Sequence, residues 1–269
     1  MKTKKGKDRW APLGESHPAG RVSTTGTAPG SPSGDSTAIF VQGLFDGIAH
    51  SYDTSAQALT FFQYLRWRSF LVSQMAFRPG NLVLDVCTGT AGVALEIAHR
   101  HNGQIVGLDI SHSMLEAGLH AVEKRSLDGR IQLIQGCADY LPFPDDTFDT
   151  VVFTYLLRYV QDPDATIRGL SRVLKPGGQL LSLELGLPSI RWVHALWLIY
   201  TKSILPTLAL PASQGWHRVS RFLGPSISRF WKRYPVDELA AMWRQNGFPV
   251  VEIKHLFGGA AIVMWGKKH

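Results

Sequence analysis

Hydrophobic residues in the middle of the chain form short runs that alternate with stretches of helical periodicity. Strand-like runs lie at residues 82–86, 105–109, 131–134, 151–154 and 180–184. Between them, apolar residues recur near helical spacing over 93–99, 111–124 and 164–174, and Ser111 is placed to act as an N-cap. Strands that alternate with helices predict an α/β fold with a doubly wound, mostly parallel sheet.

Residues 186–234 depart from this alternation. Trp, Leu and Ile are dense there, but charged residues and Pro206 and Pro211 interrupt them too often for a membrane-spanning helix. We expect a helical, aromatic-rich lobe inserted before the last two strands. It would form a lid over a lipophilic substrate, lie at a membrane interface, or pack on the domain. Its second half interleaves Arg and Lys with Trp and Phe, which suits an anionic lipid surface or nucleic acid.

The composition supports one domain behind a distinct tail. The chain has 269 residues, of which 45% are hydrophobic, enough to bury a full core over residues 37–269. Residues 1–36 are rich in Gly, Ser and Pro and contribute three of the seven net positive charges, so we expect a disordered basic tail. It resembles neither a signal nor a transit peptide. The two cysteines, Cys87 and Cys137, indicate a reducing compartment, and we expect a cytoplasmic protein.

Two acids end the first two strands, with a turn of small residues between them. Asp85 ends the first strand, the turn 87–92 contains Gly89 and Gly92, and Asp109 ends the second strand. Small residues let backbone N–H groups and a helix N-terminus approach a ligand. An acid about 20 residues beyond such a turn accepts hydrogen bonds from ribose hydroxyls. We therefore expect an adenosine-binding half-site that includes Asp85, Gly89 and Asp109.

The glycine pattern favours one adenosine cofactor over another. A dinucleotide needs G-x-G-x-x-G so that the backbone can approach a pyrophosphate, but Cys87 and Ala91 stand where glycine would help most. S-adenosylmethionine has no phosphate, so small residues suffice. A strand–turn–helix unit without any ligand is the remaining alternative. No cluster of Cys and His predicts a metal.

Several segments together resemble a known family. They are Phe45 to Asp53, Leu84 to Gly92, Gly107 to Ile110, Leu141 to Asp149, Leu157-Arg158 and Arg172 to Gly178. In these segments the chain is similar to class I S-adenosylmethionine-dependent methyltransferases, and specifically to the quinone-ring C-methyltransferases of ubiquinone and menaquinone biosynthesis. The similarity covers residues 40 to 268.

The resemblance implies roles for particular residues. Thr90 would contact the methionine part of the cofactor, and Asp109 its ribose. The pair Cys137-Ala138 would flank the adenine, and Thr154 would contribute a hydroxyl. Arg158 would lie beside the substrate ring and stabilise the phenolate formed during methyl transfer, or else pair structurally with Asp162 or Asp164.

The chain also departs from the family pattern. The family turn G-T-G-D is Gly89-Thr90-Ala91-Gly92 here, so the turn loses an acid near the cofactor amino group. Leu156, Tyr159 and Met264 are further departures.

The resemblance implies methylation of demethylmenaquinol or a ubiquinol precursor. A methyltransferase for another hydrophobic small molecule or for RNA, and a non-catalytic binding protein, are the alternatives. No nucleic-acid partner is expected, and peripheral membrane contact and a homodimer are left open.

Overall fold

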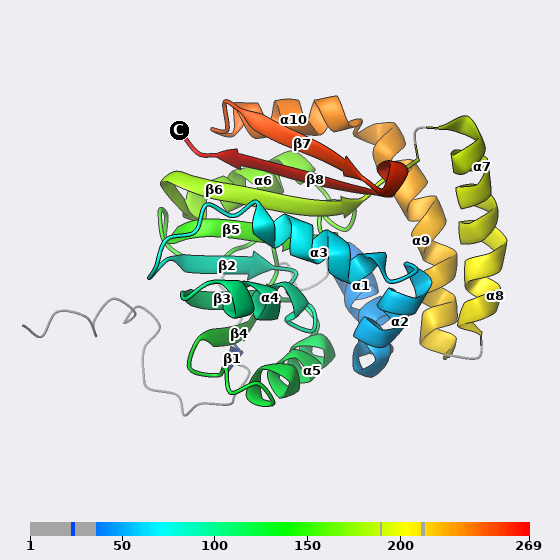
Figure 1. Ribbon diagram of the computed structural model, residues 1–269, viewed down its shortest axis with the longest axis horizontal. Helices are drawn as coiled ribbons and strands as arrows, with labels where there is room; N and C mark the ends of the chain where they lie inside the picture. Colours follow the sequence, from blue (N-terminus) through cyan, green and yellow to red (C-terminus); the bar gives the residue numbers. More distant parts are fainter. Residues whose placement is uncertain (1–22, 25–35, 189, 211–212) are drawn as a thin grey trace, which may run out of the picture.

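A computed structural model describes residues 23–24, 36–188, 190–210 and 213–269 of the chain. Its described strands form a sheet in the order β1-β4-β3-β2-β5-β6-β8-β7 (Figure 1). The strands are β1 (Ser23–Thr24), β2 (Leu82–Val86), β3 (Gln104–Asp109), β4 (Ile131–Gln135), β5 (Phe148–Thr154), β6 (Leu174–Leu185), β7 (Val251–Leu256) and β8 (Ala261–Lys267). The five strands expected from hydrophobic runs are all present as β2 to β6.

The sheet is mostly parallel and doubly wound, as predicted. The chain runs from β2 outward to β3 and β4, then returns to the other side of β2 with β5 and β6. Strand β8 alone among the paired strands runs antiparallel to its neighbours β6 and β7. The order reverses beside β2, and ligands of open α/β sheets bind at such a reversal, outside the carboxyl ends of the strands.

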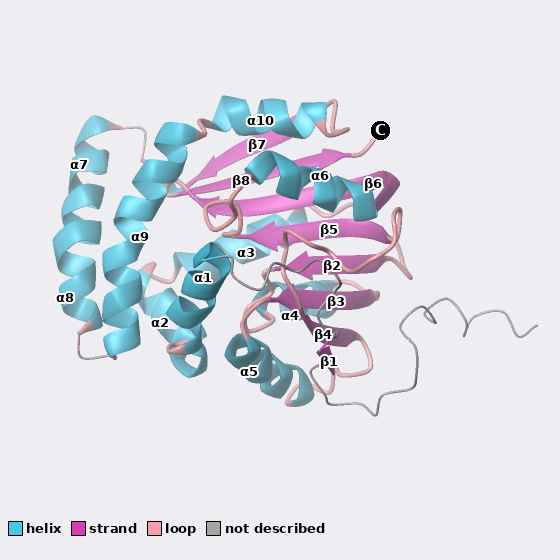
Figure 2. Cartoon of the chain, turned by 180° about the vertical axis from the view of Figure 1, so that it is seen from behind, coloured by secondary structure: helices cyan, strands magenta, loops and turns pink. Residues whose placement is uncertain are grey.

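Helices cover both faces of the sheet (Figure 2). They are α1 (Ser36–Asp46), η1 (Ala49–Ser51), α2 (Tyr52–Leu59), α3 (Gln63–Ser73), α4 (Gly92–Arg100), α5 (His112–Glu123), α6 (Pro163–Val173), α7 (Arg191–Ile199), η2 (Tyr200–Ile204), α8 (Leu205–Ala209), α9 (Gln214–Arg233), α10 (Val236–Gln245) and η3 (Phe257–Gly259). Helices α3, α4 and α5 pack with Val83 in one buried cluster, whereas α6, α9 and α10 pack with Leu84 in another. Neighbouring strand residues thus face opposite cores, because side chains alternate across a strand.

Local signals fix several helix ends. The Ser111 hydroxyl accepts a hydrogen bond from the N–H of Met114, so the predicted N-cap of α5 is confirmed. Asp162 caps α6 in the same way, through the N–H groups of Asp164 and Ala165. These caps satisfy N–H groups that have no partner within the helix.

A group of helices stands beyond the carboxyl ends of the parallel strands. Helices α7, α8 and α9, from the lobe expected at 186–234, lie there together with α1 and α2 (Figure 1). Leu44 and Ile48 pack against Trp216 and Val219 of α9 in a third buried cluster. Segments far apart in sequence therefore enclose the edge of the sheet where ligands bind.

Two residues within the expected N-terminal tail belong to the described part of the chain. Ser23–Thr24, inside the segment predicted to be disordered, form the short strand β1, which pairs parallel with Ile134 and Gln135 of β4. The edge of β4 offers unpaired backbone groups, and two extended residues satisfy some of them. The rest of the predicted tail, residues 1–22 and 25–35, lies outside the described residues.

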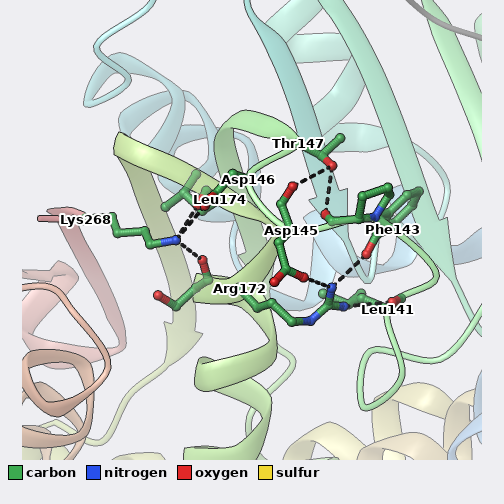
Figure 3. Close-up of polar contacts among 10 residues, drawn as sticks. Leu141, Phe143, Asp145, Asp146, Thr147, Arg172, Leu174 and Lys268 are labelled. Carbon is green, nitrogen blue, oxygen red and sulfur yellow. Dashed lines mark hydrogen bonds and ion pairs between the residues drawn. The ribbon is translucent and has the colours of Figure 1, made fainter. Parts of the chain in front are cut away.

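One motif of the family resemblance, Leu141 to Asp149, is held by the end of α6 and by the C-terminus (Figure 3). The Arg172 guanidinium donates to the carbonyls of Leu141 and Phe143 and to Asp145. Nearby, the Lys268 ammonium donates to Asp146 and to two backbone carbonyls. Residues 141–149 line neither of the two cavities described below. The hydrogen bonds from Arg172 and Lys268 therefore hold the loop before β5 in place.

Candidate active site

The turn between β2 and α4 is tightly wound. Cys87, Gly89 and Ala91 have positive φ angles of 58°, 53° and 61°. Such a conformation costs a non-glycine residue about 1–3 kcal/mol and persists only where the surroundings enforce it. Asp85 provides part of that enforcement, because its Oδ2 accepts hydrogen bonds from the Thr88 hydroxyl at 2.7 Å and from the N–H of Ala94 at 3.1 Å.

Asp85 supports the turn from behind. Its side chain is fully buried, and burial raises the pKa of its carboxyl group to about 7. It does not line the cavity in front of the turn. The sequence placed Asp85 in the cofactor site; in the structure its contacts are with the turn and the start of α4.

Asp109 lies at the end of β3 and faces the turn from the front. Its Oδ2 accepts a hydrogen bond from the N–H of Gly89 at 2.8 Å, and its Oδ1 accepts one from the N–H of Ser111 at 2.9 Å. Burial raises the pKa of its carboxyl group, and these N–H groups oppose the rise. The carboxylate therefore ties the first turn to the second strand while remaining at the cavity wall.

A cavity of about 90 Å³ lies in front of the turn. Four of the sequence-predicted residues line it together: Gly89, Thr90, Asp109 and Thr154. Cys137 and Ala138 follow β4 at the same edge of the sheet but are not lining residues. Ala138 packs instead in the buried cluster with Leu108. The structure thus brings Asp109 together with the hydroxyls of Thr90 and Thr154. Cys137 and Ala138, the two residues expected to flank the adenine, lie outside the cavity lining.

A larger cavity of about 220 Å³ adjoins the first. Its lining is mainly aromatic and aliphatic and comes from α1, α2, α3, β6, α7, η2, α8, α9 and η3 and from the loops beside them. Five aromatic residues line both cavities: Phe45, Tyr52, Tyr64, Tyr155 and Tyr159. Burial raises the pKa of each of the four tyrosines, so these phenols stay neutral at physiological pH. The two cavities therefore meet at a neutral aromatic boundary.

Arg158 brings a positive charge into the larger cavity. Its guanidinium carbon lies 4.6 Å from the centre of the Tyr159 ring, and Nε and Nη1 are buried without a hydrogen-bond partner among the described residues. The structural pairing considered from the sequence does not occupy it. Asp162 caps α6, and Asp164 contacts Arg168 and Asn246. The guanidinium is thus available to a ligand.

A buried acid that the sequence analysis missed lies near Arg158. Glu184 of β6 is 4% exposed, and its Oε1 accepts a hydrogen bond from the N–H of Leu157 at 2.9 Å. Burial raises the pKa of the Glu184 carboxyl group to about 7, although the Arg158 charge opposes the rise. Glu184 sits in an apolar strand run and is 26 residues beyond Arg158, so neither motif nor spacing distinguishes it.

The basic and aromatic residues of α9 separate onto different faces. Trp216, Phe230 and Trp231 are buried, whereas Arg218 and Arg221 are exposed. This is the pattern of an amphipathic helix that packs on a domain. The buried rings of Trp216, Phe230 and Trp231 are therefore not available to stack on bases.

The sequence of the chain matches a known protein family. Residues 33–268 match the sequence profile of the ubiE/COQ5 methyltransferase family. The chain belongs to this family. The demethylmenaquinone methyltransferase of Geobacillus kaustophilus (strain HTA426) is 36% identical to this ubiE/COQ5 family member over 231 residues, which are 85% of this chain and 97% of that protein. The ubiquinone/menaquinone biosynthesis C-methyltransferase UbiE of Shewanella woodyi is 32% identical over 87% of this chain and 92% of its own.

Solved structures share the fold of this ubiE/COQ5 family member. A SAM-dependent methyltransferase from Aquifex aeolicus superposes with a TM-score of 0.54 at 16% identity, covering 75% of this chain and 89% of that one. Together with the family match, this makes the protein an S-adenosylmethionine-dependent methyltransferase.

The lining of the smaller cavity in this protein fits S-adenosylmethionine chemically. Asp109 brings to its wall a carboxylate, a group that can accept hydrogen bonds from ribose hydroxyls, and Thr90 and Thr154 bring hydroxyls. No Lys, Arg or His is among its lining residues in the described part of the chain, so it offers no cationic side chain to a pyrophosphate. The donor set suits a cofactor without phosphates, in agreement with the sequence expectation.

Proposed function

We propose that this protein methylates a ring carbon of a reduced prenylated quinone, demethylmenaquinol or a ubiquinol precursor. One observation carries the proposal: the smaller cavity, whose lining suits the methyl donor, and a larger apolar cavity with a single guanidinium share a boundary of aromatic side chains. An apolar enclosure with few polar groups suits a lipid-like acceptor. The names of the relatives from Geobacillus kaustophilus and Shewanella woodyi support the same acceptor class.

The protein contributes position and electrostatics to the reaction. S-adenosylmethionine supplies an electrophilic methyl group on a sulfonium when it is bound. Asp109 would accept hydrogen bonds from the ribose hydroxyls, and Thr90 and Thr154 would fix the cofactor from the turn and from β5. The aromatic residues that line both cavities would exclude water from the reacting atoms.

Arg158 would stabilise the charge that develops on the acceptor. A quinol that loses a phenolic proton becomes nucleophilic at the neighbouring ring carbon. The guanidinium stays protonated and cannot be the base, but its unpartnered Nε–H and Nη1–H can donate to the phenolate oxygen. Because they are fixed before the acceptor binds, these donors need little reorganisation during the reaction.

The test compares the two redox forms of the acceptor. The purified protein is incubated with methyl-labelled S-adenosylmethionine and demethylmenaquinone, either reduced by dithionite or left oxidised. We expect carbon-methylated product from the reduced form alone, identified by mass spectrometry and NMR. Equal transfer to both forms, a product methylated on oxygen, label in RNA, or no turnover of the cofactor would each overturn the proposal.

The outer face of α7 and α8 suggests how a lipid acceptor reaches the site. Apolar side chains that are 45–67% exposed lie on this segment and its flanks: Ile190, Trp192, Leu196, Ile199, Ile204, Leu208 and Leu210. Trp192, Leu196 and Ile199 follow helical spacing, and Lys202 is exposed nearby. The same segment lines the larger cavity through Trp197, so one element has an apolar outer face and a cavity-facing side chain. No helix in the described ranges is both long and apolar enough to cross a membrane.

We propose that this face rests on a membrane surface, where prenylated quinones reside. Exposed aromatic and aliphatic side chains next to basic residues bind anionic lipid surfaces. Co-sedimentation with phosphatidylglycerol vesicles should therefore exceed that with phosphatidylcholine vesicles. A homodimer that covers the same face would instead appear as a concentration-dependent dimer in sedimentation velocity, with no vesicle binding, and would replace this proposal.

A further inference from the structure

The carboxylate of Asp53 has an unpartnered oxygen beside the cofactor turn. Asp53 belongs to the first turn of α2, and its Oδ2 accepts a hydrogen bond from the Thr90 hydroxyl at 2.9 Å. Its Oδ1 is buried and has no hydrogen-bond partner among the described residues. Thr90 lines the smaller cavity, and so does Tyr52, which precedes Asp53. A buried carboxylate oxygen without a donor is costly, so it points to a donor that the described residues do not supply.

The other two acids at the turn hold hydroxyl and backbone N–H groups of the protein. Asp85 is fully buried behind the turn and bonds to Thr88 and Ala94. Asp109 bonds to Gly89 and Ser111 and faces the place expected for the ribose. Asp85 Oδ1 is also buried without a partner among the described residues, but Asp85 lies behind the turn, whereas Asp53 reaches the turn through the side chain of Thr90, which lines the cavity.

The turn itself cannot provide an acid at Gly92. This position has no side chain, and a Cβ placed there would clash with the guanidinium nitrogen Nη1 of Arg68. Arg68 thus fills the space in which a side chain of the turn would begin. The turn has no acid at this position, and α2 offers one beside the turn, through Asp53 and its contact with Thr90.

We propose that Asp53 binds the α-ammonium group of the cofactor's amino-acid end. S-adenosylmethionine and its product S-adenosylhomocysteine both carry this cation, which loses water when it enters a closed cavity and then needs an anionic partner. Asp53 Oδ1 accepts the ammonium hydrogen bond, while the bond from Thr90 to Oδ2 fixes the carboxylate. The inference rests on the methyl donor and not on the acceptor.

The experiment measures a preference between two ligands. S-adenosylhomocysteine and its deaminated analogue, which keeps the carboxylate but lacks the ammonium, are titrated calorimetrically into the full-length protein. The wild-type protein should bind S-adenosylhomocysteine about 10- to 160-fold more tightly, the range for a charge-assisted hydrogen bond. Asp53→Asn, which still offers Thr90 an acceptor, should reduce that preference to less than about threefold.

Asp46→Asn is a matched control. Asp46 ends α1, and its Oδ1 accepts a hydrogen bond from the hydroxyl of Ser111, another lining residue of the same cavity, at 2.6 Å. This variant removes an equivalent carboxylate and should keep the preference for the ammonium-bearing ligand.

Two outcomes would overturn the assignment. One is a wild-type protein that binds both ligands equally, a measurement that needs no variant. The other is an Asp53→Asn variant that lowers the affinity for both ligands by the same factor, which would mean that Asp53 only supports the structure of α2. Failure of the quinol proposal would leave these binding data unchanged, because no acceptor is present.

Discussion

Replacing Arg158 with lysine tests the proposed catalytic role of the guanidinium. The substitution keeps a positive charge but loses the planar pair of donors. In the structure, Nε and Nη1 are both buried and unpartnered, so both can donate to the acceptor oxygen. We expect Arg158→Lys to keep the affinity for S-adenosylhomocysteine and to lower turnover.

The magnitude follows from the donors that are lost. A hydrogen bond to a charged group contributes about 1.5–3 kcal/mol, and a lysine ammonium can replace one of the two. Losing the other lowers kcat/KM for the reduced quinol by about 10- to 160-fold. The contact with the Tyr159 ring, at 4.6 Å, is worth about 0.5–2 kcal/mol and is partly retained by lysine. The unfolding temperature should therefore fall by no more than about 4 °C.

Arg168→Lys serves as the control for this measurement. Arg168 carries the same side chain, 66% exposed, in an ion pair with Asp164 at 2.5 Å. Surface pairs of this kind contribute little, so this variant should keep both turnover and stability. The interpretation of Arg158 is refuted if Arg158→Lys keeps normal kcat/KM per folded molecule, above all if it also unfolds at a much lower temperature. Arg158 would then be a structural residue.

Four further predictions use single substitutions. Asp109→Ala should weaken S-adenosylhomocysteine binding by about 1.5–3 kcal/mol in calorimetry, because a carboxylate acceptor for the ribose is lost; unchanged affinity would remove Asp109 from the site. Trp197→Ala should raise KM more for long-chain than for short-chain quinols, since Trp197 lines the larger cavity, and equal effects would assign it to the fold. Trp192, 67% exposed, is its counterpart on the outer face, and Trp192→Ala should reduce vesicle binding without this chain-length effect. Burial raises the Glu184 pKa from 4.5 to about 7, so its neutral form favours the folded state at low pH and this contribution is lost as the pH rises through that window. Melting temperatures of Glu184→Gln should therefore fall less than those of the wild type between pH 5 and 8, and superimposable profiles would show that Glu184 does not titrate there.

Local sequence determined the frame of the cofactor site. The apolar run at 82–86 predicts β2, and the acid near its end predicts where it stops. This works because a strand of a parallel sheet is buried on both faces and therefore has a nearly continuous apolar sequence. The same reasoning predicts β3 and places Asp109 at its carboxyl end. Ser111 predicts the start of α5 because an N-cap is a contact between near neighbours. Each of these features depends on a few consecutive residues.

The tertiary structure decided which side chains meet. Asp53 and Thr90 are 37 residues apart, and Leu157 and Glu184 are 27 apart, yet each pair is joined by a hydrogen bond. Asp85 and Asp109 end neighbouring strands in the same way, but Asp85 lies behind the turn and Asp109 in front of it. Periodicity gives the face of an element and not its distant neighbour, because long-range contacts depend on how whole elements pack. The sequence by itself therefore determined the strands, the turn and the class of cofactor, while packing of α2, α3 and the 186–234 lobe over the sheet decided the shape of both cavities.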